Sequence, residues 1–321
     1  MENLEKTKVT NMAEKINEEL KKVIVEQEEL IELSVISLIS GGHVLLEGVP
    51  GLAKTLMVRA LAKTLSLDFK RVQFTPDLMP ADLTGTKVFN MSTREFELKK
   101  GPLFTNFLLA DEINRTPPKT QAGLLEAMAE NTISIDGDMQ ELSKPYMVFA
   151  TQNPLEYEGT YPLPEALVDR FLMKIVIDYP SAKAEKEVLR RHNEGFSSID
   201  LDKCGLNIVF SGEDILQCRE EVQKVKVEEA LMEYIVAIVS ETRNNPAIEI
   251  GSSPRGTIAL LQCSKACAAY KGRDYVIPED IKNMAYPTLR HRIILKPELE
   301  LEGVKAEQVL SDILAKIKVP R

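Results

Sequence analysis

One loop in the sequence has the residue types and spacing of a phosphate-binding site. It runs from Gly48 to Thr55 and follows the apolar stretch His43–Glu47, which predicts a strand. In such a loop, glycines let backbone N–H groups turn inward around an anion, and the following helix adds its positive end. We expect Lys54 to reach the β- and γ-phosphates of ATP and the Thr55 hydroxyl to ligate Mg²⁺. The predicted ATP-binding residues of this loop are Gly48, Val49, Pro50, Gly51, Leu52, Ala53, Lys54, Thr55 and Leu56.

Ala53 departs from the usual pattern of this loop, G-x-x-x-x-G-K-[ST], because it stands at the place of the second glycine. Alanine adopts right-handed helical dihedral angles without strain. We therefore expect Ala53 to belong to the helix that follows. Taken alone, the loop is also compatible with an ordinary Gly-Pro turn before an amphipathic helix.

An acidic pair supplies a second element of nucleotide chemistry. Asp111 and Glu112 follow the apolar stretch Phe107–Ala110, which predicts a buried strand. Ligands of open parallel sheets bind at the carboxyl ends of the strands, so we expect this pair beside the phosphate loop. Asp111 would hold Mg²⁺ through its water shell, and Glu112 would act as general base on the attacking water. A solvated acidic turn is the alternative interpretation.

The composition is that of a globular protein with a buried core. The chain has 321 residues, which suits two domains, and 44% of them are apolar. Its formal net charge of −9 disfavours general binding to nucleic acid or anionic membranes, which needs clustered Lys and Arg. The N-terminal residues lack a signal-peptide pattern, and no apolar run approaches the roughly 20 residues that span a bilayer. We expect a cytoplasmic protein without membrane insertion.

The four cysteines do not suggest a disulfide scaffold in a chain of this length. Cys263 and Cys267 fall within an alanine-rich helical stretch at a spacing that places them on one helix face. No histidine or carboxylate cluster stands beside them in the sequence. We expect both to pack in the core rather than to bind a metal.

Alternating strands and helices predict how these residues are positioned. Short apolar stretches separated by helical segments indicate a five-stranded parallel sheet with helices on both faces. The predicted strands are His43–Glu47, Phe69–Phe74, Phe107–Ala110, Met147–Thr151 and Leu172–Ile177. Helices are expected at Lys54–Leu65 and Lys119–Glu130, and residues 1–22 predict a charged surface helix.

Two segments interrupt this alternation. Gly85–Gly101 and Thr132–Leu142 each predict a β-hairpin, and Asp136 and Gly137 form the turn of the second. We expect both hairpins to project from the α/β core as inserts.

Beyond Pro180 the sequence predicts helices and no further strands. Residues 1–180 are therefore assigned to an α/β nucleotide-binding domain with a helical N-terminal segment, and residues 181–321 to an all-α lid domain. Ser253 is a good N-cap and Pro254 suits the first position of a lid helix. The predicted helices are Ala182–His192, Glu213–Lys224, Glu228–Thr242, Pro254–Lys271, Pro278–Leu289 and Ala306–Ile317.

Taken together, these motifs resemble the MoxR family of AAA+ ATPases over nearly the whole chain. The resemblance is carried by Gly42–Thr55, Gln73–Pro80 and Asp111–Arg115. It implies a P-loop AAA+ core with two hairpin inserts and a helical lid, and an ATP hydrolase that forms a homo-oligomeric ring, a hexamer. It further implies chaperone-like remodelling, assembly or cofactor insertion of other proteins, with von Willebrand factor A domain proteins as partners.

The same resemblance implies roles for residues outside the phosphate loop. Asn153 is similar to sensor 1, which orients the attacking water beside Glu112. Arg170 is similar to the arginine finger, which reaches the γ-phosphate in a neighbouring subunit and contributes on the order of 10³–10⁵ in rate. Arg255 is similar to sensor 2 on the lid. A turn-forming Asn before proline and an Arg paired with Asp169 are the alternative interpretations of Asn153 and Arg170.

Val25 is similar to a family residue that packs against adenine. It lies in the segment Val23–Gln27, where Glu26 stands at a position that the family usually fills with glycine. Arg115 is also similar to a family residue, without an assigned role.

Two other functions stay open from the sequence alone. Helicase-related AAA+ proteins share both hairpin inserts, so a nucleic-acid motor is one alternative, against which the net charge argues. A nucleotide-gated scaffold with negligible turnover is the other. The complete set of candidate groups disfavours a scaffold: Lys54, Asp111, Glu112, Asn153, Arg170 and Arg255.

Overall fold

A parallel sheet organises the part of the chain that the computed structural model describes, residues 7–154, 159–198 and 200–320. Among these residues the sheet has five strands in the order β2-β5-β8-β1-β9. The strands are β1 (His43–Glu47), β2 (Phe69–Gln73), β5 (Phe107–Asp111), β8 (Met147–Gln152) and β9 (Phe171–Val176). Each predicted strand is confirmed to within one residue at either end.

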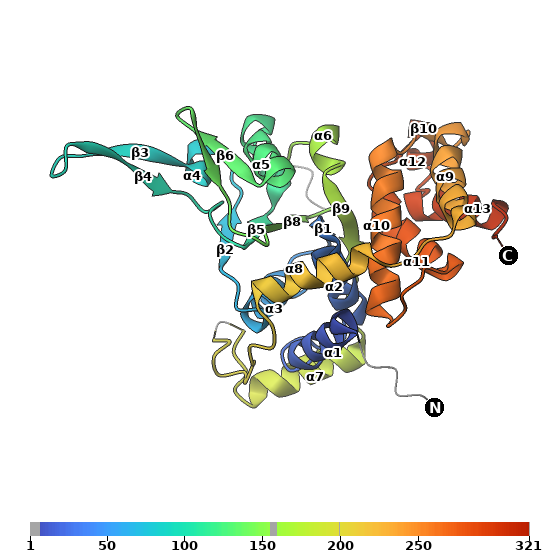
Figure 1. Cartoon of the computed structure of the whole chain (residues 1–321), viewed down its shortest axis with the longest axis horizontal. Coiled ribbons are helices and arrows are strands. Elements are labelled where there is room, and N and C mark those ends of the chain that lie inside the picture. Colours follow the sequence, from blue (N-terminus) through green and yellow to red (C-terminus); the bar gives the residue numbers. More distant parts are fainter. Residues whose placement is uncertain (1–6, 155–158, 199, 321) are drawn as a thin grey trace.

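Side chains of the strands alternate between two hydrophobic clusters, one on each face of the sheet. Leu109 and Phe149 belong to one cluster, and their neighbours Leu108 and Val148 belong to the other. Helices cover both faces, as expected (Figure 1). The first cluster includes residues of α1 (Lys8–Leu20), α2 (Glu28–Ser40), α3 (Lys54–Thr64) and α8 (Gly212–Gln223), and the second includes residues of α5 (Pro118–Glu130).

Helix α1 is more deeply buried than the expected surface helix. Met12, Ile16 and Leu20 recur at helical spacing and are fully buried, while Glu14, Lys15 and Glu18 between them are exposed. The apolar stripe thus makes α1 part of the core. Residues 1–6 of the predicted helical segment lie outside the described residues.

Both predicted hairpins are confirmed, and the first extends far from the body of the molecule (Figure 1). An ion pair of 2.5 Å between Lys87 and Asp138 joins one hairpin to the other. The first hairpin follows the short helix α4 (Pro80–Thr84). The hairpin strands are β3 (Gly85–Asn90) and β4 (Glu95–Lys100), then β6 (Thr132–Ile135) and β7 (Asp138–Glu141).

The C-terminal region is helical, as expected, but the prediction that it contains no strand is wrong. An antiparallel pair joins β10 (Ile248–Ile250) to β11 (Ile294–Leu295). Strands of two and three residues are too short to show an alternating pattern in a sequence. The helices are α7 (Ala182–Asn193), α8, α9 (Glu229–Asn244), α10 (Pro254–Tyr270), α11 (Pro278–Leu289), α12 (Pro297–Leu301) and α13 (Ala306–Lys316).

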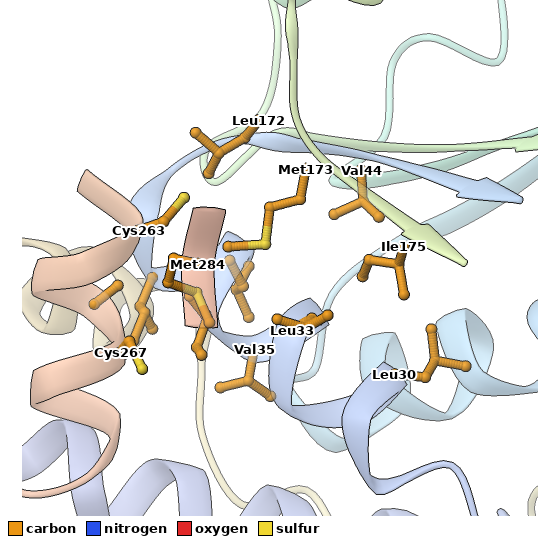
Figure 2. Packing of buried hydrophobic residues seen from close by; sticks show 14 of the residues in the cluster. Leu30, Leu33, Val35, Val44, Leu172, Met173, Ile175, Cys263, Cys267 and Met284 are labelled. Atoms are coloured by element: carbon orange, nitrogen blue, oxygen red, sulfur yellow. The ribbon is translucent and has the colours of Figure 1, made fainter. Parts of the chain in front are cut away.

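The hydrophobic core runs without a break from the sheet into these helices. Helix α10 packs against α2 and α11, and α11 packs against β9. Cys263 and Cys267, on α10, are fully buried near Met284, so their expected place in the core is confirmed (Figure 2). One cluster of buried residues therefore includes residues from both sides of Pro180. The domain boundary near Pro180 stays a prediction. Within the described residues, no helix is long and apolar enough to cross a membrane.

A buried histidine begins strand β1. The backbone N–H of Val148 donates to Nδ1 of His43 at 3.0 Å, which places the ring proton on Nε2, and Nε2 then donates to the carbonyl of Met128 at 3.1 Å. The ring is 6% exposed. Burial lowers the pKa of His43 from 6.5 to about 4, so the imidazole is neutral in the folded protein at pH 7.

Acidification should destabilise the protein through His43. Because the folded-state pKa lies below the unfolded one, the stabilisation is present above pH 6.5 and is lost as the pH falls towards 4. Between pH 7 and pH 5 we expect a loss of about 2 kcal/mol in the free energy of unfolding. The measurement is urea unfolding of the wild type and of His43→Asn, which keeps an acceptor for Val148 but does not titrate. Parallel pH profiles for the two proteins would contradict this assignment.

Candidate functional site

A cleft of about 880 Å³ lies at the carboxyl edge of the parallel sheet. Three parts of the chain line it: the loop after β1, the ends of β5 and β8, and a wall formed by residues 23–27 with α7 and the segments beside it. The lining includes these predicted site residues: Val25, Pro50, Gly51, Leu52, Ala53, Lys54, Thr55, Leu56, Asp111, Glu112 and Asn153. The sheet thus brings most of the predicted site together, while Gly48 and Val49 lie outside the lining.

Close backbone approach explains one glycine of the loop, and a positive φ explains the other. A Cβ on Gly48 would lie 2.8 Å from the carbonyl oxygen of Ile177, so no larger residue fits without displacing the backbone. Gly51 has a φ of 89°, which L side chains rarely adopt. The loop leads into α3, which begins at Lys54, so the first N–H groups of this helix face the cleft.

The expectation that Ala53 has right-handed helical angles is wrong. Its φ and ψ are 58° and 16°, and it caps α3 from the left-handed region. Alanine in this region costs about 1 kcal/mol because its Cβ crowds the carbonyl oxygen. The turn from the loop into the helix requires the left-handed geometry, which explains why glycine is usual here.

Lys54 extends across the loop that it follows. Its Nζ donates to the carbonyl oxygen of Gly48 at 2.6 Å. Burial lowers the pKa of Lys54, and the carboxylates of Asp111, Glu112 and Glu47 partly oppose that effect. An anion in the cleft would restore favourable charge around this ammonium group.

The hydroxyl group of Thr151 contacts both residues of the acidic pair. Thr151, in the neighbouring strand β8, donates to Oδ1 of Asp111 at 2.5 Å and accepts from the backbone N–H of Glu112 at 2.8 Å. The other oxygen of Asp111 accepts from Nε and Nη2 of Arg71, at 3.0 and 2.6 Å. Thr151 and Arg71 thus fix the orientation of the Asp111 carboxylate.

Glu112 combines a strained backbone with a restrained side chain. Its φ is 54°, and non-glycine residues in this region recur at functional sites. Oε2 accepts from Nε2 of Gln73 at 2.5 Å and pairs with Nε of Arg115 at 3.0 Å. Arg115, whose role the sequence left open, is therefore a direct partner of the candidate general base.

Sequence analysis missed Arg71, Gln73 and Thr151. Arg71 and Gln73 lie on β2, and strand pairing sets Gln73 opposite Asp111. The available signal was the polar character of this strand, in which Lys70, Arg71 and Gln73 outnumber the apolar residues. The sequence does not show that β2 pairs with β5, so these polar residues could not be assigned to the acidic pair.

The residues present suit a magnesium nucleotide. Thr55 and Asp111 line the same cleft as Lys54, which gives a hydroxyl, a carboxylate and an ammonium group around one volume. Among the described residues, no group of three His, Cys, Asp or Glu side chains could hold a metal ion by itself. Mg²⁺ bound here would take most of its ligands from phosphates and water, its usual manner in nucleotide sites.

The part of the cleft beside α7 combines apolar side chains with the polar groups of Glu185, Arg191 and His192. Val25 lines it, as expected for an adenine contact, together with Tyr179, Val188 and Leu189 beside it. Sequence analysis missed the contribution of α7 and the residues around it. The available signal was the apolar pair Val188 and Leu189 within a mostly charged helical stretch, and the structure leaves Leu189 71% exposed.

Arg170 and Arg255 lie away from the cleft of their own subunit. Arg170 directly precedes β9, and pairing sets Phe171 opposite His43, at the amino-terminal edge of the sheet. The phosphate loop begins at the opposite edge, about 15 Å away along β1. Nη1 of Arg255 lies 3.4 Å from Oδ2 of Asp169, beside Arg170. The structure thus pairs Arg255 with the segment that precedes β9 rather than with the phosphate loop of the same chain.

Arg292 anchors this segment to the C-terminal helices. Its guanidinium is 3% exposed and donates to Oδ1 of Asp169 at 3.0 Å and to the carbonyl oxygens of Phe171 and Leu172 at 2.7 and 3.1 Å. A buried arginine with these partners fixes the backbone on both sides of Arg170.

Known proteins resemble the chain over both of its main regions. Residues 43–173 match the ATPase family associated with various cellular activities (AAA), and residues 240–313 match an AAA lid domain. The uncharacterized protein YeaC of Bacillus subtilis is 48% identical over 303 residues, with 94% of this chain and 93% of YeaC covered. Chaperone MoxR1 of Mycobacterium tuberculosis is 40% identical over 312 residues, covering 94% and 81%. A crystal structure of a Cytophaga hutchinsonii protein aligns with a TM-score of 0.88 and 46% identity, covering 98% and 97%.

Replacing Ala53 with glycine should stabilise the fold. Glycine adopts the left-handed region without the Cβ penalty, so we expect Ala53→Gly to raise the free energy of unfolding by about 0.5 kcal/mol. The matched control is Ala122→Gly, at an exposed position inside α5, which should lower it by about 1 kcal/mol. Urea unfolding of both variants measures the effect. Destabilisation of similar size at both positions would show that the left-handed geometry at Ala53 is not a source of strain.

Proposed function

Because the chain belongs to the MoxR family of AAA+ ATPases, we propose that it hydrolyses Mg-ATP and uses the cycle to remodel partner proteins. One observation carries the proposal. The phosphate loop, Asp111, Glu112 and Asn153 line a single cleft at the carboxyl edge of the sheet. A loop suited to phosphate, a carboxylate suited to Mg²⁺ and a second carboxylate suited to act as base support hydrolysis of Mg-ATP.

The phosphates of ATP would bind at the start of α3. There, N–H groups and the positive end of the helix dipole favour an anion. Lys54 would exchange its hydrogen bond to the carbonyl of Gly48 for bonds to phosphate oxygens. The negative charge of the phosphates would then stabilise the ammonium group, whose charged form burial disfavours. Thr55 and Asp111 would hold Mg²⁺, the latter through water, and the ion would neutralise charge on the phosphates.

Glu112 would take the proton of the attacking water, and the Asn153 amide would orient that water. To do so, the Glu112 carboxylate exchanges one of its bonds to Gln73 and Arg115 for a bond to water. Thr151 keeps the base aligned with Asp111 throughout, because it bonds the side chain of one and the backbone of the other.

Arg170 and Arg255 would serve the site of a neighbouring copy. Both lie near the amino-terminal edge of the sheet, with Asp169 between them, whereas the phosphate loop lies at the carboxyl edge. A cation at the far edge reaches an ATP γ-phosphate only when a second subunit stacks against it. We therefore propose a homo-oligomeric ring, a hexamer, with each site completed by the next subunit.

The work of the ring would be chaperone-like. The relative MoxR1 carries the name chaperone. In this chain, the projecting β3–β4 hairpin exposes Met91 and Phe96, at 83% and 70%, to a client protein. We propose that proteins with von Willebrand factor A domains are partners of the ring. Four free cysteines, three of them buried, suit the reducing cytoplasm in which we place it.

Two variants test the hydrolytic site. Lys54→Ala should weaken ATP binding by about 100-fold or more, because a charge-assisted contact to the phosphates is lost. Glu112→Gln should bind ATP normally while phosphate release falls by about 10²–10⁴-fold. Fluorescent-nucleotide titration and steady-state phosphate release measure the two quantities, and Glu130→Gln on the exposed face of α5 is the control. Equal background-level turnover in the wild type and Glu112→Gln would instead support a nucleotide-gated scaffold.

Mixing variants tests the shared site. Arg170→Ala should bind ATP yet lose hydrolysis, and Arg255→Ala should behave in the same way. When Arg170→Ala is mixed with Glu112→Gln, random assembly leaves about a quarter of interfaces with both groups intact, so part of the activity should return. A mixture of Arg170→Ala and Arg255→Ala should recover no activity, because every subunit then lacks one of the two arginines that it supplies to its neighbour. An absence of rescue in the first mixture rules out completion of the site by a neighbour.

A further inference from the structure

The loop between α1 and α2 has an unusual backbone next to the part of the cleft beside α7. Glu26 and Gln27, which are consecutive, have φ values of 51° and 109°. Side chains other than glycine rarely adopt such angles, so the surrounding structure must hold the loop in place. Val23, Ile24 and Val25, directly before it, line the cleft.

The Glu26 side chain fastens this loop to the start of α7. Oε2 accepts from the backbone N–H of Ser181 at 2.8 Å, and Oε1 accepts from the Ser181 hydroxyl at 2.9 Å. Ser181 is the N-cap of α7 and in turn accepts from the N–H of Ala184 at 3.2 Å. A carboxylate at this position also complements the positive end of the helix dipole. These bonds lower the pKa of Glu26, so it is ionised at neutral pH.

A second contact fastens the other end of the same helix. Nη1 of Arg191, in the last turn of α7, donates to the carbonyl oxygens of Lys22 and Lys21 at 2.9 and 3.4 Å. Glu187, one turn earlier, orients the guanidinium by accepting from its Nε at 3.0 Å. Helix α7 is therefore tied at both ends to the chain that precedes α2.

These two contacts hold α7 beside residues 21–26, and both α7 and residues 23–25 line the cleft. One wall is the segment with Val23 and Val25, and the other holds Tyr179, Val188 and Leu189. A flat apolar ring fits between such walls only while their separation is fixed. The phosphate loop, Asp111 and Glu112 do not contact Glu26 in any bond described for it.

We propose that Glu26 is a positioning residue for the nucleotide base: it holds α7 against residues 23–27, so that the two apolar walls grip the base of ATP. This inference rests on the proposed binding of ATP in the cleft. It assigns Glu26 a side-chain contact that glycine at the same position would lack. The triphosphate end is held by other groups, so Glu26 affects binding through the base alone.

The test compares a ligand that has a base with one that does not. Glu26→Ala keeps a Cβ and the same backbone demand but loses the carboxylate, whereas Glu26→Gly also relieves the positive φ. For both variants we expect affinity for Mg-ATP to fall about tenfold, while affinity for Mg-tripolyphosphate is unchanged. KM for ATP should rise in step, with kcat unchanged. Glu26→Gln, which still accepts from Ser181, should recover most of the affinity.

Glu28→Ala is the matched control. It removes the same charge from an exposed position two residues away, at the start of α2, and should leave both affinities unchanged. Equal losses for ATP and tripolyphosphate in Glu26→Ala would overturn the proposal, because they would indicate general unfolding of the site. Wild-type affinity for ATP in Glu26→Gly would also overturn it. If the wild type bound tripolyphosphate but not ATP, the proposed function itself would fail, an outcome separate from either of these.

Discussion

The parallel register of the central sheet is the constraint on which the candidate site depends. Strands β1, β5 and β8 run in the same direction, and pairing sets Ala150 opposite both Ala110 and Leu45. The residues that follow these strands therefore meet at one edge, although they are far apart in the sequence. A slip of one residue in any pair would turn the functional side chains to the wrong face. Thr151 reinforces the register at the point where it matters, by bonding to both members of the acidic pair.

Features encoded by local pattern could be predicted from the sequence. The strands, both hairpins, the phosphate loop and the Ser253 cap of α10 each arise from a few neighbouring residues, and the structure contains all of them. Features that need knowledge of neighbours in space could not be predicted. Arg71 and Gln73 reach the acidic pair only because β2 pairs with β5, and Arg255 meets Asp169 only because α10 packs beside the start of β9.

Backbone geometry forms a second class of missed features. Ala53 was expected in a helical conformation because alanine favours it, yet the turn between loop and helix imposes left-handed angles. Tertiary structure overrides local propensity at Glu26 and Glu112 as well. All three positions adjoin the cleft or its walls, which agrees with the general tendency of strain to gather at functional sites.

The carboxylate of Asp169 links the C-terminal helices to the segment that precedes β9. It accepts from Ser253 at 3.1 Å and contacts Arg255 on α10, it pairs with buried Arg292, and it directly precedes Arg170. These contacts join the start of α10 and the buried Arg292 to the residue before Arg170, so a displacement of either would be transmitted to the backbone of Arg170.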